Sequence, residues 1–85
     1  MTAPPAAKRR IAILGSTGSI GTNVLRVVDA FPGRFAVTAL AAGGNAPVLA
    51  EQVARYKPKL VSVQDEAALG RLSALVDLRG VRAVS

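Results

Sequence analysis

Short apolar runs alternate along the chain with longer amphipathic stretches. After Arg10, the run at 10–14 is continuously apolar, which is typical of a strand covered on both faces of a sheet, and further predicted strands occupy 34–41, 59–63 and 81–84. Between them lie three stretches in which apolar residues recur every three or four positions, which is the spacing of one helix face. The pattern therefore predicts the element order βαβαβαβ.

The first amphipathic stretch predicts a helix over 20–31. We expect its apolar stripe to face the core, and we expect Pro32 and Gly33 to end the helix. The stripe consists of Ile20, Val24, Val27 and Phe31, widened by Leu25 and Val28.

The second and third helices have recognisable boundaries. Asn45 and Asp65 are good N-cap residues, and Pro47 suits a first helical turn because its missing N–H costs nothing there. Pro58 ends the second helix and Gly80 follows the third. The predicted stripes are Leu49, Val53 and Tyr56 in the second helix, and Ala68, Leu72 and Leu75 in the third.

Strands that alternate with helices favour right-handed crossovers and a parallel sheet. We therefore predict an α/β fold, namely a Rossmann-type parallel sheet. We expect an incomplete doubly wound domain, because the sequence stops as the strand at 81–84 begins. Residues 1–7, with two prolines, are predicted to be a disordered leader, and 8–85 to form the N-terminal portion of one domain.

Composition excludes several classes of function. The 85 residues are 51% hydrophobic, which is too apolar for intrinsic disorder. Cysteine and histidine are absent, which excludes disulfides, thiolate catalysis and imidazole catalysis from this segment. The carboxylates are not spaced as a metal cluster or an acid/base pair. No apolar run approaches the length of a membrane span, so we expect a cytoplasmic location and no membrane partner.

The net charge of +6 raises the question of an acidic partner. The basic residues gather only at 8–10 and, loosely, at 55–59, and no aromatic platform accompanies them. This arrangement favours a solvated surface and no nucleic-acid partner. A small basic nucleic-acid-binding module stays open as an alternative.

Residues 15–21, which we call the first glycine turn, read Gly-Ser-Thr-Gly-Ser-Ile-Gly between a predicted strand and a predicted helix. Glycines in this context allow a tight turn, close backbone approach to a pyrophosphate, and close contact between helix and strand. The hydroxyls of Thr17 and Ser19 and the N–H groups at the helix start would reach phosphate oxygens. The alternative is a glycine-rich connection that only turns the chain.

Residues 42–45, the second glycine turn, follow the second predicted strand and read Ala-Gly-Gly-Asn. Enzymes that prefer NAD usually place a carboxylate here to bind the ribose 2′-hydroxyl. Its absence permits NADP, although the turn holds no arginine or lysine to pair with a 2′-phosphate. The alternative is that Asn45 is only a helix cap.

The strings at 10–21 and 40–45 closely resemble the N-terminus of the 1-deoxy-D-xylulose 5-phosphate reductoisomerase family, and the resemblance extends over 8–85. It implies NADPH-dependent rearrangement and reduction of 1-deoxy-D-xylulose 5-phosphate to 2-C-methyl-D-erythritol 4-phosphate, in non-mevalonate isoprenoid biosynthesis. It also implies a homodimer that requires magnesium or manganese. The cofactor-binding residues implied by the resemblance are Thr17, Gly18, Ser19, Ile20, Gly43, Gly44 and Asn45.

In that family the metal ligands and the substrate-binding groups lie in later segments. The resemblance therefore implies that this chain belongs to a cofactor-binding domain and is not catalytic alone. Another Rossmann oxidoreductase with the same glycine spacing, such as a semialdehyde dehydrogenase, is the alternative within enzymes. Such an enzyme needs a catalytic cysteine further along its chain.

Overall fold

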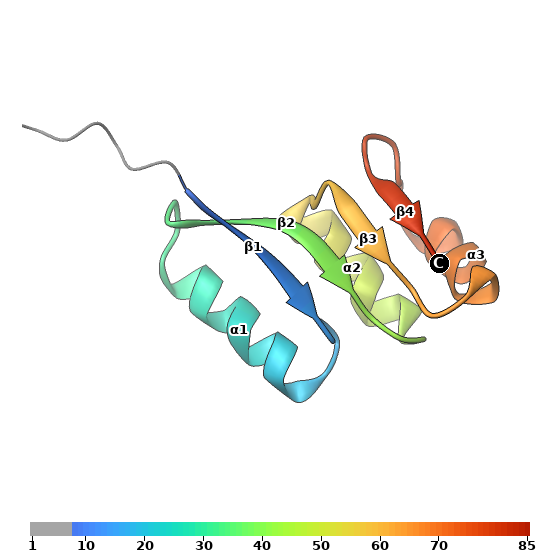
Figure 1. Cartoon of the computed structure of the whole chain (residues 1–85), viewed down its shortest axis with the longest axis horizontal. Coiled ribbons are helices and arrows are strands. Elements are labelled where there is room, and N and C mark those ends of the chain that lie inside the picture. The colour runs from blue at the N-terminus through green and yellow to red at the C-terminus, as the bar shows by residue number, and fades with distance from the viewer. Residues whose placement is uncertain (1–7) are drawn as a thin grey trace, which may run out of the picture.

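A parallel four-stranded sheet organises the computed structural model, which describes residues 8–85 (Figure 1). The strands are β1 (Arg9–Leu14), β2 (Phe35–Ala41), β3 (Leu60–Ser62) and β4 (Arg82–Val84). Their spatial order is β1-β2-β3-β4, and every neighbouring pair is parallel. The predicted α/β class, element order and Rossmann-type sheet are confirmed. The predicted leader at 1–7 lies outside the described residues.

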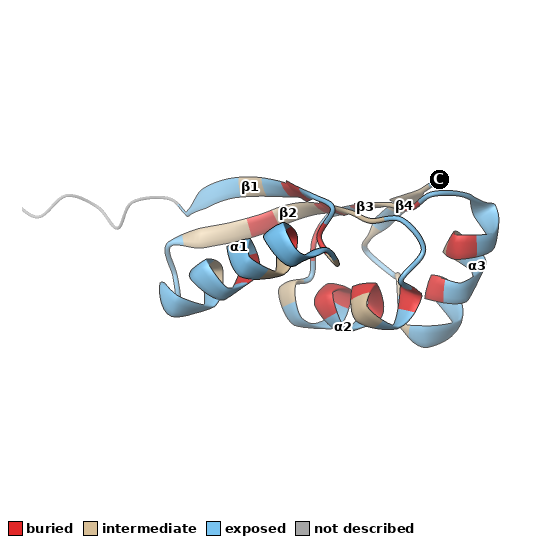
Figure 2. Cartoon of the chain, turned by 90° about the horizontal axis from the view of Figure 1, so that it is seen from below, coloured by how far each residue is buried: buried red, intermediate tan, exposed pale blue. Residues whose placement is uncertain are grey.

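Three helices connect the strands, and all of them lie on one face of the sheet (Figure 2). They are α1 (Ser19–Ala30), α2 (Ala46–Tyr56) and α3 (Glu66–Leu75). Because each connection moves one strand further in the same direction, right-handed crossovers place all three helices on the same side. Within residues 8–85 the other face of the sheet carries no helix, and no helix is both long and apolar enough to cross a membrane.

The best-buried part of the core lies between the sheet and the helices α2 and α3. Leu40 of β2, Val61 of β3, Leu49 of α2 and Leu72 of α3 are at most 1% exposed. The caps of both helices are as predicted, since Asn45 precedes α2 and Asp65 accepts a 2.8 Å hydrogen bond from the Ala68 N–H.

The buried face of α1 differs from the predicted one. Ile20 is 79% exposed, and Val27 and Phe31 are each about half exposed, whereas Leu25 is only 4% exposed. Figure 2 shows most of α1 in the colour of exposed residues. The physical reason is Gly21, which packs against the backbone of the first glycine turn and so directs the line through Leu25 towards the sheet. The predicted stripe of 20, 24, 27 and 31 as the core-facing side was wrong.

Two further predicted core residues are exposed. Leu14 in β1 is 83% exposed although its neighbour Ile13 is 5% exposed, because helices cover only one face of this edge strand. The prediction that β1 is covered on both faces was therefore wrong for the described residues. Leu75, in the last turn of α3, is 55% exposed, whereas Ala68 and Leu72 are buried as predicted.

Candidate nucleotide-binding site

Both glycine turns lie at the carboxyl edge of the sheet. The Ser16 N–H donates a 3.0 Å hydrogen bond to the carbonyl of Ala41, so the start of the first turn is attached to the end of β2. The Ala42 N–H donates in turn to the carbonyl of Ser62, at the end of β3. The parallel register thus brings the predicted residues at 17–20 and 43–45 to adjacent positions on one edge, where α/β sheets bind their ligands.

The first glycine turn requires glycine at two positions for different reasons. Gly15 has φ +68°, a left-handed conformation that other residues rarely adopt. A Cβ at Gly21 would overlap the Gly15 carbonyl oxygen and lie 2.7 Å from the Ser16 Cα. A Cβ at Gly18 would lie 3.4 Å from the same oxygen, which is nearly ordinary contact. The first and last glycines therefore determine the conformation of the turn. The middle one leaves its outer surface free of a side chain.

The N-terminus of α1 is open to an anion. Gly18 is the N-cap and has no side chain to accept a hydrogen bond from the N–H groups of the helix, and the first turn of α1 contains no acidic residue. Ser19 and Ile20 are exposed, and within residues 8–85 no hydrogen bond is formed by their N–H groups, whereas the Gly18 N–H donates to the Gly15 carbonyl. Unpaired N–H groups and the helix dipole make such an end favourable for phosphate. The Thr22 hydroxyl instead donates back to the carbonyl of Gly18 at 2.9 Å.

A buried hydrogen bond supports the first glycine turn from below. The Gln52 side chain of α2 is buried, and its Nε2 donates to the carbonyl oxygen of Ser16 at 2.7 Å. Ser16 itself is fully buried. Gln52 is not among the residues predicted from the sequence, although an amide between Leu49 and Val53 on an apolar helix face was an available signal. Gln52 is therefore a positioning residue for the turn.

The second glycine turn is open and is flanked by two polar side chains. The carbonyl of Gly43 accepts a 3.4 Å hydrogen bond from the Gln64 N–H. A Cβ at Gly43 would lie 3.5 Å from Gln64 Oε1, and a Cβ at Gly44 would lie 3.9 Å from Arg71 Nη2. Asn45 Oδ1 accepts a 3.4 Å hydrogen bond from the Val48 N–H, so its capping role is observed. Its contact with a cofactor stays a prediction.

A separate polar cluster connects the far ends of α1 and α2. The Tyr56 hydroxyl donates to Asp29 at 2.9 Å, and Arg55 pairs with the same carboxylate at 2.9 Å. Burial and the hydrogen bond to Asp29 raise the pKa of Tyr56 above its usual value. These residues line a groove of about 780 Å³ between the two helices, and neither glycine turn contributes to it. The cluster is thus a helix–helix contact outside the nucleotide site.

Metal binding finds no support in the part of the chain that the structure describes. Residues 8–85 contain no group of three or more histidine, cysteine, aspartate or glutamate side chains that could hold an ion. The divalent cation implied by the resemblance is therefore not assigned to any residue here.

Known proteins resemble this chain in both sequence and structure. The family model for 1-deoxy-D-xylulose 5-phosphate reductoisomerase matches residues 11–84. The reductoisomerase of Anaeromyxobacter sp. (strain K) is 63% identical over 60 residues, which are 71% of this chain and 15% of that protein. The reductoisomerase of Symbiobacterium thermophilum is 58% identical over 69 residues, which are 81% of this chain and 18% of that protein. The chain thus spans less than a fifth of the length of these relatives.

A solved structure provides an independent comparison. The 1-deoxy-D-xylulose 5-phosphate reductoisomerase from Zymomonas mobilis in complex with NADPH superimposes with a TM-score of 0.82 at 29% sequence identity. The match covers 93% of this chain and 21% of that one. Both comparisons confirm the resemblance, and they favour it over a semialdehyde dehydrogenase or a nucleic-acid-binding module. The chain belongs to the 1-deoxy-D-xylulose 5-phosphate reductoisomerase family.

Proposed function

We propose that this chain binds NADPH and supplies part of the cofactor site of a 1-deoxy-D-xylulose 5-phosphate reductoisomerase. The observation that carries the proposal is the open N-terminus of α1, where Gly18 leaves the first N–H groups without a capping side chain. The NADPH in the related Zymomonas structure supports the choice of cofactor.

The residues of the first glycine turn suit a pyrophosphate. The N–H groups of Ser19 and Ile20 would donate to its oxygens, and the hydroxyls of Thr17 and Ser19 would add further donors. Gly18 would let the phosphate approach the backbone closely, because no side chain stands over the helix end. The dipole of α1 favours an anion there by about 0.3–1 kcal/mol.

The second glycine turn would face the adenosine end of the cofactor. Gly43, Gly44 and Asn45 stand where Rossmann domains contact the adenosine ribose, and none of them is acidic. A carboxylate at this position would repel a 2′-phosphate, so the turn accepts NADPH as well as NADH.

The complete reaction is part of the same proposal. NADPH, when bound, supplies the hydride that reduces the rearranged aldehyde, and a magnesium or manganese ion assists. Residues 8–85 contain no histidine or cysteine and no carboxylate cluster, so we assign no catalytic residue to them. The substrate 1-deoxy-D-xylulose 5-phosphate and the homodimer belong to this proposal as well. A cytoplasmic location stays a prediction.

Two variants at Gly18 test NADPH binding at the first glycine turn. Asparagine and aspartate have the same size and are both good N-caps, so Gly18→Asn and Gly18→Asp differ chiefly by one negative charge. That charge would stand beside the pyrophosphate. At about 4 Å, repulsion between two unit charges is worth about 1–4 kcal/mol, depending on solvent exposure.

We therefore expect Gly18→Asp to bind NADPH at least about fivefold more weakly than Gly18→Asn. The measurement is a fluorescence titration of NADPH against the complete polypeptide that carries this chain. Thermal unfolding of both variants controls for folding, and both should unfold at or above the temperature of the unaltered protein because the cap improves. Equal NADPH affinities of the two variants would contradict a pyrophosphate at this helix end.

A further inference from the structure

The side chain of Arg71 reaches across from α3 to the second glycine turn. Its Nη2 lies 3.9 Å from the position that a Cβ on Gly44 would occupy. Gln64 flanks the same turn, with its Oε1 3.5 Å from the corresponding position on Gly43. The two glycines therefore leave an open surface that an amide and a guanidinium border.

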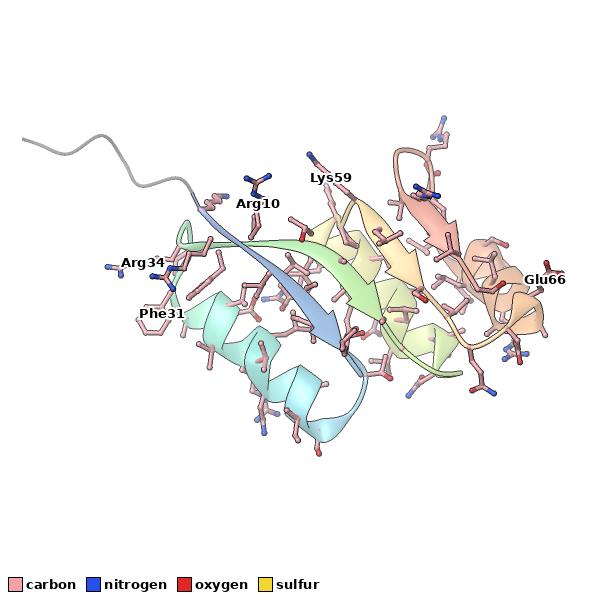
Figure 3. All side chains as sticks on the ribbon, in the orientation of Figure 1. Arg10, Phe31, Arg34, Lys59 and Glu66 are labelled. Atoms are coloured by element: carbon pink, nitrogen blue, oxygen red, sulfur yellow. The ribbon has the colours of Figure 1, made fainter. Side chains whose placement is uncertain are left out.

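Arg71 is available to bind an anion. The ion pairs formed within residues 8–85 are Arg55–Asp29 and Arg79–Asp77, and neither involves Arg71. Two carboxylates lie at the start of the same helix, one as its N-cap and one in its first turn. Asp65 is engaged in capping the Ala68 N–H at 2.8 Å, and Glu66 is exposed at the outer side of α3 (Figure 3). Among residues 8–85, an exposed guanidinium thus lies beside the turn without a paired carboxylate.

Other basic side chains cluster at the opposite edge of the sheet. Arg10 is the second residue of β1, and Arg34 and Lys59 directly precede β2 and β3, far from the carboxyl edge that bears the turns (Figure 3). The positive charge of the chain therefore does not by itself favour an anion at the second glycine turn. The Arg71 guanidinium, in contrast, lies near that turn, with its Nη2 3.9 Å from the position of a Cβ on Gly44.

We propose that Arg71 binds the 2′-phosphate of NADPH and so determines the preference for NADPH over NADH. The end of the second strand is where Rossmann domains contact the adenosine ribose, and an arginine nearby can accommodate a 2′-phosphate. The planar guanidinium can donate two parallel hydrogen bonds to phosphate oxygens. The inference rests on the proposed function, because it assumes that NADPH lies along the two turns.

The role of the second glycine turn is then to leave room. A Cβ at Gly44 would lie at ordinary contact distance, 3.9 Å, from Arg71 Nη2, whereas glycine leaves that space to a phosphate between the backbone N–H groups and Arg71. The basic group that the turn itself lacks is thereby supplied from α3.

The test compares four ligands on the complete polypeptide that carries this chain. Dissociation constants are measured by calorimetry for NADPH and NADH, and for 2′,5′-ADP and 5′-AMP, which differ by the 2′-phosphate alone. We expect Arg71→Ala to raise the dissociation constants of NADPH and 2′,5′-ADP at least about tenfold, because a charge-assisted hydrogen bond is lost. The dissociation constants of NADH and 5′-AMP should not change. Arg71→Lys should retain part of the preference, since it keeps the charge without the planar fork.

Arg34→Ala is the matched control, because it removes one exposed arginine from the opposite edge of the sheet. This variant should bind all four ligands with the affinities of the unaltered protein. Unfolding temperatures of both alanine variants should match that of the unaltered protein, since both side chains are exposed.

The outcomes separate this inference from the proposed function. If Arg71→Ala keeps the same NADPH-to-NADH affinity ratio while both cofactors bind, the role of Arg71 is refuted and NADPH binding stands. Equal weakening of all four ligands refutes it too, because Arg71 then does not act on the 2′-phosphate. If the unaltered protein binds neither cofactor, the proposed function fails and this inference fails with it.

Discussion

Replacement of Gln52 tests whether the buried amide holds the first glycine turn in place. Its Nε2 donates to the carbonyl oxygen of Ser16 at 2.7 Å, and both residues are buried. Gln52→Met keeps the length of the side chain and removes the donor. Gln52→Glu keeps the shape and places a carboxylate oxygen against the carbonyl oxygen.

The two variants should differ strongly in stability. A buried carbonyl left without a donor costs about 1–3 kcal/mol. Gln52 Oε1 is itself buried and has no partner within the described chain, so methionine relieves a part of that cost. We expect a net loss of about 1 kcal/mol for Gln52→Met, and about 3 kcal/mol or more for Gln52→Glu near neutral pH, because an unpaired charge is then buried.

The loss of unfolding free energy caused by Gln52→Glu should grow as pH rises. Burial raises the pKa of the new carboxyl in the folded state above its unfolded value of about 4.3. Stability is therefore highest below about pH 4, where the protonated acid can donate to Ser16, and is lost as pH rises through the folded-state pKa. Gln52→Met has no titratable group and should show no such dependence.

Urea unfolding followed by circular dichroism, near pH 4 and near neutral pH, measures both effects. Glu51→Met is the matched control, because Glu51 is the exposed neighbour on the same helix and its replacement should change stability by less than about 0.5 kcal/mol. A Gln52→Glu variant that is as stable as the Glu51→Met control, or equally destabilised at both pH values, would refute the buried hydrogen bond as the support of the turn.

Two further predictions concern Gly21 of α1 and Tyr56 of α2. Gly21→Ala should lower the free energy of unfolding by about 1–3 kcal/mol, because its Cβ would overlap the backbone of the first glycine turn. Gly70→Ala, in open space within α3, should instead raise it by about 0.5–1 kcal/mol, and thermal unfolding of the pair checks the contrast. For Tyr56, an absorbance titration should give a pKa above the usual value, and Asp29→Asn should bring it down again. Since the folded-state pKa is raised, the contribution of Tyr56 to stability is intact below about pH 10 and is lost as pH rises through the folded-state value.

Local signals were sufficient to predict the elements of the fold. The βαβαβαβ order follows from apolar runs and helical spacing, and the caps Asn45 and Asp65 act through hydrogen bonds to N–H groups three residues ahead. The meeting of the two glycine turns was also predictable, because parallel strands bring their carboxyl ends to one edge. These features depend on neighbouring residues and on topology, both of which the sequence contains.

The orientation of α1 depends on a close backbone contact at Gly21, which the pattern of hydrophobic residues does not reveal. Its residues offer two overlapping apolar lines, one through Ile20 and Val24 and another through Leu25. The number of bulky side chains would predict that the first line faces the sheet. The close approach of Gly21 to the backbone of residues 15 and 16 selects the second, because only the side without a Cβ can come that near. The smallest residue of the helix therefore determines which large ones are buried.

Two residues of the proposed nucleotide site lie on helices outside the two glycine turns, and the sequence gives a signal for only one of them. Gln52 interrupts the apolar face of α2, and a buried amide needs a partner, so its position was a usable signal. Arg71 gives none, because an exposed arginine on a helix is ordinary. Its relevance arises only from topology: α3 follows β3, β3 pairs with β2, and α3 therefore packs beside the turn that ends β2. In this chain the pyrophosphate would then be held by the backbone of one crossover and the 2′-phosphate by a side chain of another, so the choice between NADPH and NADH can change without altering either glycine turn.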